Sequence, residues 1–174
     1  LKIKWTNRVQ AYNTKKADGT GREVLEEIHT LTFDGDKIEC EVELIPLEDI
    51  NIKRWYGFQG FGAKTVFKNI RYVSGLNRGV YDGSVVDTSS GNKDPNKVIA
   101  YGDNYSLSIG IDRTYDLGRC LLSNSTKGMF TDHTTGKIYC DIINEYGLPA
   151  GVTTVLPSGE RYYLRGFYKF ESAN

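Results

Sequence analysis

Residues Asp36–Gly62 read DKIECEVELIPLEDINIKRWYGFQGFG, an alternating segment followed by an aromatic turn that is rich in glycine. From Ile38 to Leu44, apolar residues occupy every second position, with charged residues between them. A period of two with β-branched residues predicts a strand with one buried and one solvated face. The aromatic part, Arg54–Gly62, holds four aromatic residues and three glycines, so we expect it in the core or at a binding surface.

Similar alternation recurs downstream. Strands are expected at Tyr105–Asp112, Lys137–Asn144 and Arg161–Phe170. Arg22–Phe33 fits either a helical face or a strand. We interpret it as mainly strand, because Asp34-Gly35-Asp36 then makes a hairpin turn into the next strand. Turn signals separate roughly ten to twelve short strands in total, which is typical of a sandwich or a barrel.

The predicted fold is all-β: residues 1–174 form a single antiparallel β-sandwich of jelly-roll type. Asp36–Leu44 and the three downstream strands are expected to be central. Near the start, the expected core anchors are Trp5, Val9 and Tyr12. The chain opens on Leu1 with neither an initiator Met nor a signal peptide, so we expect a domain excised from a longer protein.

Composition narrows the function classes. The chain has 174 residues with 22 basic and 22 acidic side chains, so no basic excess points to nucleic acid. No apolar run approaches the roughly 18 residues needed to cross a membrane, so no membrane partner is expected. The expected location is extracellular or at the cell surface. The sequence does not indicate the oligomeric state.

The cysteines Cys40, Cys120 and Cys140 show no C-x-x-C spacing, and their odd number leaves at least one thiol unpaired. Cys40 and Cys140 lie on the apolar phase of predicted strands, where a thiol behaves as a small hydrophobe. We therefore expect three unbridged cysteines with a structural role, and one disulfide is the open alternative.

No stretch is a diagnostic catalytic motif, so no catalytic residue is assigned. Glu39, Glu41 and Glu43 project from one strand face with neighbouring Cα atoms about 7 Å apart. Glycosidases use paired carboxylates near that spacing, but a solvated strand face is the commoner explanation. The only histidines, His29 and His133, accompany no G-x-S-x-G elbow and no zinc spacing.

Aspartates near turns keep a structural calcium ion as an open alternative, and no other cofactor is expected. None of them forms a D-x-[DN]-x-[DN]-G loop, and aspartate is common in turns for other reasons. The acidic positions concerned are Asp34, Asp36, Asp82, Asp87, Asp94, Asp103, Asp112 and Asp116.

Aromatic residues beside polar ones are the best lead to a ligand site. On the final strand, Tyr163 and Phe167 share a face with basic side chains, a mixture that suits a polar ligand. The alternative is an ordinary outer sheet face with cross-strand pairs. The predicted ligand-binding residues are Trp55, Tyr56, Gln59, Tyr163 and Arg165, together with the long irregular segment Ser74–Asn96.

Trp55 illustrates the ambiguity. On an unbroken strand it points away from Ile50 and Ile52, toward a polar face where a tryptophan suits a ligand contact. A β-bulge near Gly57 would instead turn Trp55 inward, as a core residue.

The function expected from these residues is that of a non-catalytic carbohydrate-binding module for a polysaccharide or oligosaccharide. Many short strands, with Tyr and Trp near polar turns, make the chain resemble accessory β-sandwich modules of carbohydrate-active enzymes. One rival is a glycoside hydrolase or polysaccharide lyase that uses Glu41 and Glu43, or a Tyr–Arg–His set. Another is a structural or adhesion domain of a surface or tail protein. Fold alone does not choose among them.

Overall fold

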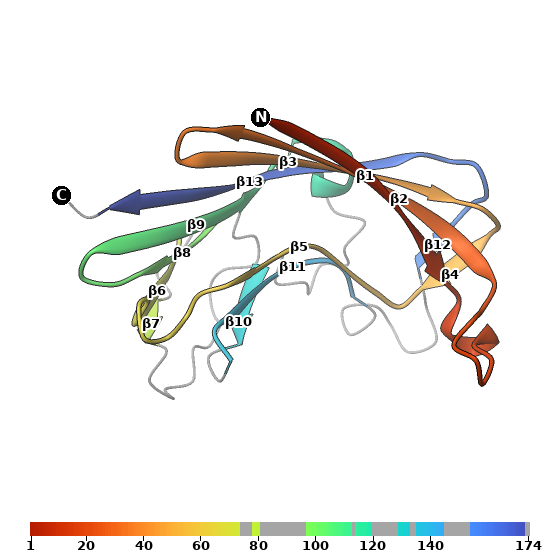
Figure 1. Cartoon of the computed structure of the whole chain (residues 1–174), viewed down its shortest axis with the longest axis horizontal. Helices are drawn as coiled ribbons and strands as arrows, with labels where there is room; N and C mark the ends of the chain where they lie inside the picture. The colour runs from red at the N-terminus through yellow and green to blue at the C-terminus, as the bar shows by residue number, and fades with distance from the viewer. Residues whose placement is uncertain are drawn as a thin grey trace.

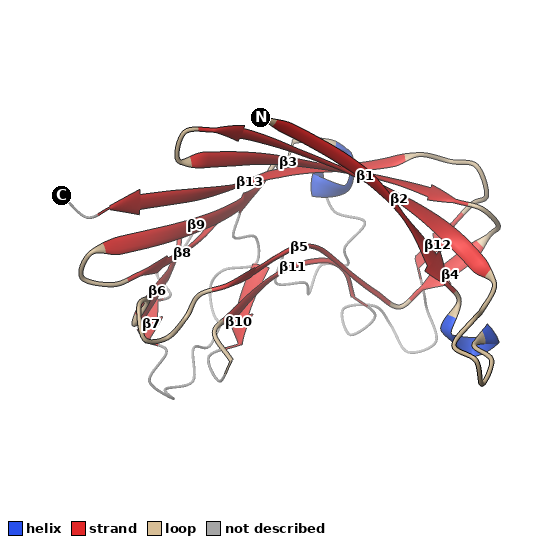
Figure 2. Cartoon of the chain, viewed as in Figure 1, coloured by secondary structure: helices blue, strands red, loops and turns tan. Residues whose placement is uncertain are grey.

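The structure is a computed structural model that describes residues 1–73, 78–80, 97–112, 114–119, 129–132, 135–144 and 154–172. Its elements are strands and two short 3-10 helices (Figure 2). In chain order they are β1 (Lys2–Gln10), η1 (Tyr12–Thr14), β2 (Glu23–Asp34), β3 (Lys37–Pro46), β4 (Ile50–Ile52), β5 (Arg54–Phe61), β6 (Asn69–Tyr72), β7 (Arg78–Val80), β8 (Lys97–Tyr101), β9 (Tyr105–Ile111), η2 (Asp116–Arg119), β10 (Met129–Asp132), β11 (Lys137–Asn144), β12 (Thr154–Leu156) and β13 (Tyr162–Ser172).

An eight-stranded antiparallel sheet dominates the molecule, with the strand order β1-β2-β3-β13-β9-β8-β6-β7. It curves over a three-stranded sheet of order β10-β11-β5, and β12 pairs with β4 at one end (Figure 1). The expectation of an all-β chain with sandwich-like packing is confirmed. The jelly-roll type stays a prediction, since the strands described divide into sheets of eight, three and two.

The strands predicted from period-two alternation are present. Arg22–Phe33 is strand and not helix, and it turns through Gly35, whose φ is 56°, into β3. A positive φ in a two-residue hairpin suits glycine, which has no side chain to clash. Of the four strands expected to be central, β3, β13 and β9 are neighbours in the large sheet, while β11 lies in the middle of the small one.

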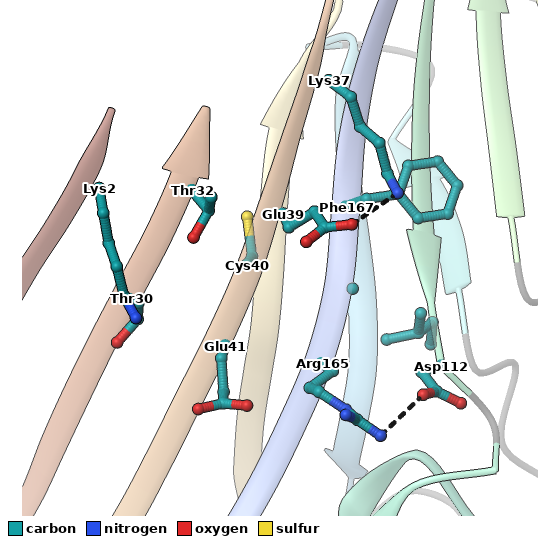
Figure 3. A pocket seen from close by; sticks show the side chains of 12 residues that line it. Lys2, Thr30, Thr32, Lys37, Glu39, Cys40, Glu41, Asp112, Arg165 and Phe167 are labelled. Atoms are coloured by element: carbon teal, nitrogen blue, oxygen red, sulfur yellow. Dashed lines mark hydrogen bonds and ion pairs between the residues drawn. The ribbon is translucent and has the colours of Figure 1, made fainter. Parts of the chain in front are cut away.

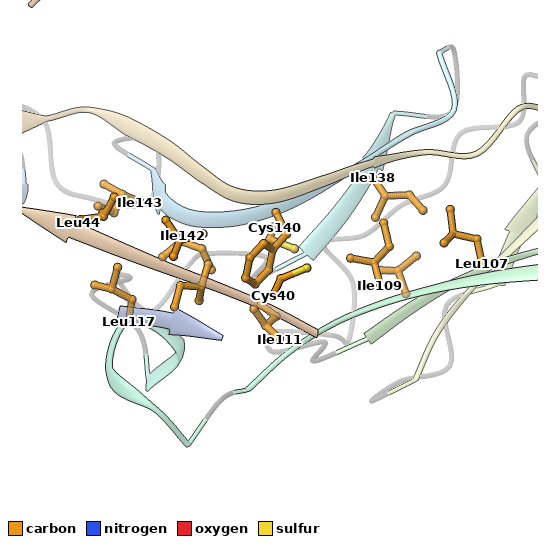
Figure 4. Packing of buried hydrophobic residues seen from close by; sticks show 14 of the residues in the cluster. Cys40, Leu44, Leu107, Ile109, Ile111, Leu117, Ile138, Cys140, Ile142 and Ile143 are labelled. Carbon is orange, nitrogen blue, oxygen red and sulfur yellow. The ribbon is translucent and has the colours of Figure 1, made fainter. Parts of the chain in front are cut away.

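The core fills the space between the two sheets (Figure 4). Val42, Leu164 and Ile109 face inward from the large sheet, and Ile138 and Ile142 face them from β11. Alternate residues of β3 are buried as predicted, because neighbouring side chains on a strand point to opposite faces. On β13 only Leu164 is buried, and Phe170 of the same phase is 49% exposed.

Two of the cysteines behave as the sequence predicted. Cys40 and Cys140 are buried free thiols, and both belong to this core cluster (Figure 4). Burial raises the pKa of the Cys40 thiol to about 12. Cys120 lies outside the described residues.

Strand β5 crosses the large sheet at close range, because it carries glycine where the sheets touch. A Cβ at Gly57 would collide with Leu164 of β13, and a Cβ at Gly60 would collide with Ile109 of β9. The pairing of β5 with β11 is also irregular: Tyr139 lies opposite Gln59, but Asp141 lies opposite Tyr56. An extra residue on β5 is a β-bulge, the feature anticipated near Gly57.

Other expectations are wrong or fall outside the described residues. Tyr12 is not a core anchor, because it is 90% exposed on the 3-10 turn that follows β1. Only β7 is described within Ser74–Asn96, so the proposed binding role of that segment lies outside the described residues. Within the described part of the chain, no helix has the length and apolar character of a membrane span.

Candidate functional site

The candidate site is a cleft on the concave face of the large sheet, beside β5. Among the described residues the small sheet has three strands, and β5 lies at its edge over β13 and β9. The inward faces of β1 and β2 therefore extend beyond it. A cavity of about 570 Å³ occupies this position, lined by β1, β2 and β5 together with Cys40–Val42 of β3 and Tyr168 of β13. Its volume is in the range of small-molecule sites, roughly 300–1,000 Å³.

Trp5 and His29 form one wall of the cleft. They are directly opposite in the β1–β2 register, and their rings stack with centroids 4.8 Å apart and planes 4° from parallel. Trp5 remains 38% exposed, so only part of its surface is covered. The expectation that Trp5 is a core anchor is therefore wrong, because the small sheet does not reach β1.

Glu27 lies next to His29 on the same face and connects the two sheets. Its Oε1 accepts a hydrogen bond of 2.9 Å from the indole Nε1 of Trp55, and its Oε2 lies 3.4 Å from Nε2 of His29. These contacts lower the pKa of the Glu27 carboxyl, the bond with His29 most strongly. The bonds from Trp55 and Asn7 act in the same direction, and burial opposes them. Glu27 is therefore a carboxylate at neutral pH.

Trp55 is partly a core residue and partly a lining residue of the cleft, so each of the two alternatives expected from the sequence applies in part. It is half-buried and packs against the core cluster, as the bulge near Gly57 would require. It also lines the cleft, with its indole N–H committed to Glu27. The direction of Trp55 cannot be inferred from Ile50 and Ile52, because these two residues form the separate strand β4. A bend at Lys53 interrupts the alternation between them and Trp55.

Tyr56 and Gln59 line the same cleft from β5. The Tyr56 ring packs at 4.8 Å against Tyr139, and the guanidinium of Arg54 lies 5.8 Å from the Tyr56 ring centre. The Gln59 side chain is exposed, while its backbone carbonyl accepts a 2.8 Å hydrogen bond from Tyr168 of the large sheet. Three of the predicted ligand-binding residues, Trp55, Tyr56 and Gln59, are thus brought together.

The other two predicted residues, Tyr163 and Arg165, lie on the opposite face of the large sheet. Arg165 makes a 3.3 Å ion pair with Asp112 (Figure 3), and its guanidinium lies 3.5 Å from the ring centre of Tyr115. Tyr163 donates a 3.3 Å hydrogen bond to Glu43. An open hollow of about 480 Å³ lies here, but it does not connect these residues to Trp55. The five residues therefore do not form one site.

The outer face of the large sheet also carries the three glutamates of β3, Glu39, Glu41 and Glu43, as the alternation predicted. Glu39 pairs with Lys37 at 2.8 Å (Figure 3), and Glu43 pairs with Arg161, the residue before β13. The side chains of Glu41 and Glu43 therefore point away from the aromatic cleft, although the segment Cys40–Val42 of β3 contributes to the cleft lining. These contacts are those of a solvated face, with one ion pair along β3 and one between β3 and the residue before β13.

No group of three or more His, Cys, Asp or Glu side chains converges among the residues that the structure describes. Asp82, Asp87 and Asp94 lie outside them, as does His133. The structural calcium ion thus stays a prediction.

Sequence reasoning missed four residues of the cleft: Trp5, Asn7, Glu27 and His29. A signal was present, since Glu27 and His29 interrupt the otherwise apolar phase of β2 that contains Leu25 and Leu31. Polar side chains need hydrogen-bonding partners when an apolar face is buried, and ligand sites commonly place a few polar groups on apolar walls.

Comparisons with known proteins complete the description. No protein-family model matches the chain, and no curated protein matches it. Among solved structures, a galactose 1-epimerase from Lactobacillus acidophilus NCFM aligns with a TM-score of 0.47 at 10% sequence identity. The alignment covers 99% of this chain and 63% of the epimerase, so the chain spans less than two thirds of that protein's length.

Proposed function

We propose that the protein is a non-catalytic carbohydrate-binding module whose ligand occupies the cleft between β1, β2 and β5. One observation carries the proposal: a continuous set of contacts runs from Trp5 through His29 and Glu27 to Trp55 along a cavity of about 570 Å³. The cavity therefore has aromatic surface at two points and polar groups between them.

This mixture matches the chemistry of a sugar ring. The C–H face of a pyranose is apolar and stacks on an aromatic ring, while its hydroxyl groups need hydrogen-bonding partners. In the cleft, Trp5 supplies partly exposed aromatic surface, and Glu27, His29 and Gln59 supply polar groups. Ligand sites commonly combine apolar walls with a few placed polar groups in this way.

The state of Glu27 favours binding over hydrolysis. A glycosidase acid must hold its proton near neutral pH, so its pKa has to be raised. The hydrogen bonds to Glu27 instead lower its pKa. The paired carboxylates Glu41 and Glu43 lie on the outer face, where Glu43 is held by Arg161.

One observation favours a second candidate, a glycan-cleaving enzyme of the lyase type. His29, Arg54 and Tyr56 all line the cleft, and together they make up the Tyr–Arg–His set considered from the sequence. In such an enzyme Arg54 would neutralise a carboxylate on the substrate, and His29 or Tyr56 would remove the proton from the carbon beside it. A C=C bond would form as the C–O bond to the leaving sugar breaks, and the departing oxygen would take up a proton from the other of these two residues or from water.

A polysaccharide panel separates the candidates. The protein is passed over immobilised glycans, and both retention and newly formed sugar ends are measured. We expect retention by at least one glycan without product, and loss of retention in Trp5→Ala. Tyr105→Ala is the matched control, because Tyr105 is 56% exposed on β9, away from the cleft.

Product that disappears in His29→Gln would instead establish the enzyme. Retention by no glycan would favour the third alternative, a structural or adhesion domain. As part of the proposal, the module acts outside the cell or at its surface as an accessory to other domains, and its strands connect as a jelly roll.

A further inference from the structure

A second cavity adjoins the cleft on the far side of Trp55. Its volume is about 810 Å³, and it is lined by the end of β1, the η1 turn, the start of β2 and the segment from Glu48 to Arg54. The two cavities have four lining residues in common: Val9, Glu27, Arg54 and Trp55. Each cavity alone is as large as a typical small-molecule site, so together they exceed the needs of one small ligand.

An ordered turn presents an aromatic ring at the outer end of this second cavity. Tyr12 lines the cavity and is 90% exposed. The turn is tied down by a 2.8 Å bond from the Ala11 amide to the Arg22 carbonyl. The Thr14 hydroxyl adds two more, accepting from the Arg22 amide and donating to the Ala11 carbonyl, both at 2.8 Å. The backbone of the turn is therefore held in place, and the Tyr12 ring is exposed on it.

Charges in the second cavity balance. The cationic lining residues are Arg22, Lys53 and Arg54, and the anionic ones are Glu27, Glu48 and Asp49. Arg22 and Glu48 neutralise each other in a 2.8 Å ion pair. The first cavity shares Glu27 and Arg54 with the second, and its described lining includes no further lysine or arginine. A groove with no cationic excess offers little attraction to an anionic chain such as a polyuronate.

We propose that the two cavities form one extended groove that binds consecutive units of an uncharged polysaccharide, with a second subsite at Tyr12. This inference rests on the proposed function, because the first subsite is the cleft between Trp5 and Trp55. It adds a second binding position, the chemical class of the ligand and a requirement for chain length. Tyr12 supplies the stacking surface of the outer subsite.

The test is isothermal titration calorimetry with ladders of cello-, manno-, xylo- and malto-oligosaccharides from one to six units. Oligogalacturonates of the same lengths provide the charged comparison. For at least one neutral ladder, we expect affinity to rise by tenfold or more with length, about 1.4 kcal/mol. Tyr12→Ala should remove most of that rise while binding of the shortest bound oligomer is unchanged. Tyr105→Ala should leave the whole ladder unchanged.

Several results would overturn the inference. Equal affinity for short and long oligomers, or a length dependence that survives Tyr12→Ala, would exclude the outer subsite and leave the cleft intact as a binding site. Tighter binding of oligogalacturonates than of every neutral ladder would exclude an uncharged ligand. Failure of every ladder to bind, at every length, would overturn the proposed function itself.

Discussion

The bond between Trp55 and Glu27 ties the small sheet to the large one, and its strength can be measured. The indole N–H donates at 2.9 Å to a carboxylate whose side chain is 16% exposed. Hydrogen bonds to charged groups contribute roughly 1.5–3 kcal/mol, and partial exposure places this one near 1.5 kcal/mol. Trp55→Phe keeps an aromatic ring but removes the donor. It should lower the free energy of unfolding by about 2 kcal/mol, or roughly 4–8 °C in Tm for a chain of this size.

A double-mutant cycle isolates the bond from the packing of the ring. Urea unfolding of the wild type, Trp55→Phe, Glu27→Ala and the double variant should give a coupling energy of about 1.5 kcal/mol. Trp5→Phe combined with Glu27→Ala is the matched control, because the Trp5 ring contacts His29 instead. A Trp55–Glu27 coupling no larger than that of the control would refute the bond as a link between the sheets.

Four further outcomes are expected. The pKa of Glu27 is lowered on folding, so this carboxylate stabilises the protein above its usual pKa of about 4.5, and that stability is lost as the pH falls through the lower pKa of the folded state. Glu27→Gln should therefore flatten the acid limb of a Tm–pH profile, and an unchanged limb would contradict this. Brief iodoacetamide labelling at pH 8 should leave Cys40 unmodified until guanidinium unfolds the protein, because burial raises the pKa of this thiol to about 12. Rapid labelling of the native protein would contradict its burial. Gly57→Ala should destabilise by roughly 1–3 kcal/mol or more in urea unfolding, because its Cβ meets Leu164, and a neutral result would show that β5 can move away. Arg165→Ala should lower the free energy of unfolding by about 1 kcal/mol in the same assay. Glycan retention should stay intact because Arg165 lies on the outer face, and lost retention would place the binding site on that face.

Alternation along the sequence located most strands because the side-chain period of a strand is a local property. It also determined which residues share a face, as for Tyr163 and Arg165 on β13. It did not determine which face of the sheet borders the cleft. That depends on where the small sheet packs, and packing between sheets is not encoded in the period of one strand.

The cleft was predicted in part for a related reason. Trp55, Tyr56 and Gln59 were identified because they fall in one short aromatic segment. Their partners on β1 and β2 are remote in sequence, and the register that places Trp5 beside His29 is set across a connection of many residues. The bulge in β5 and the break at Lys53 also shift phase in ways that a regular alternation does not anticipate.

The position of β13 has a consequence for how the chain acquires its structure. This last strand pairs with β3 on one side and β9 on the other, so it alone joins the two halves of the large sheet. Until Tyr162–Ser172 has been synthesised, β3 and β9 each present an unpaired edge to solvent or to another nascent chain. Closure of the sheet then depends on contacts between segments far apart in sequence, which form slowly. During synthesis, the interval before β13 emerges from the ribosome is therefore the period of greatest exposure to aggregation.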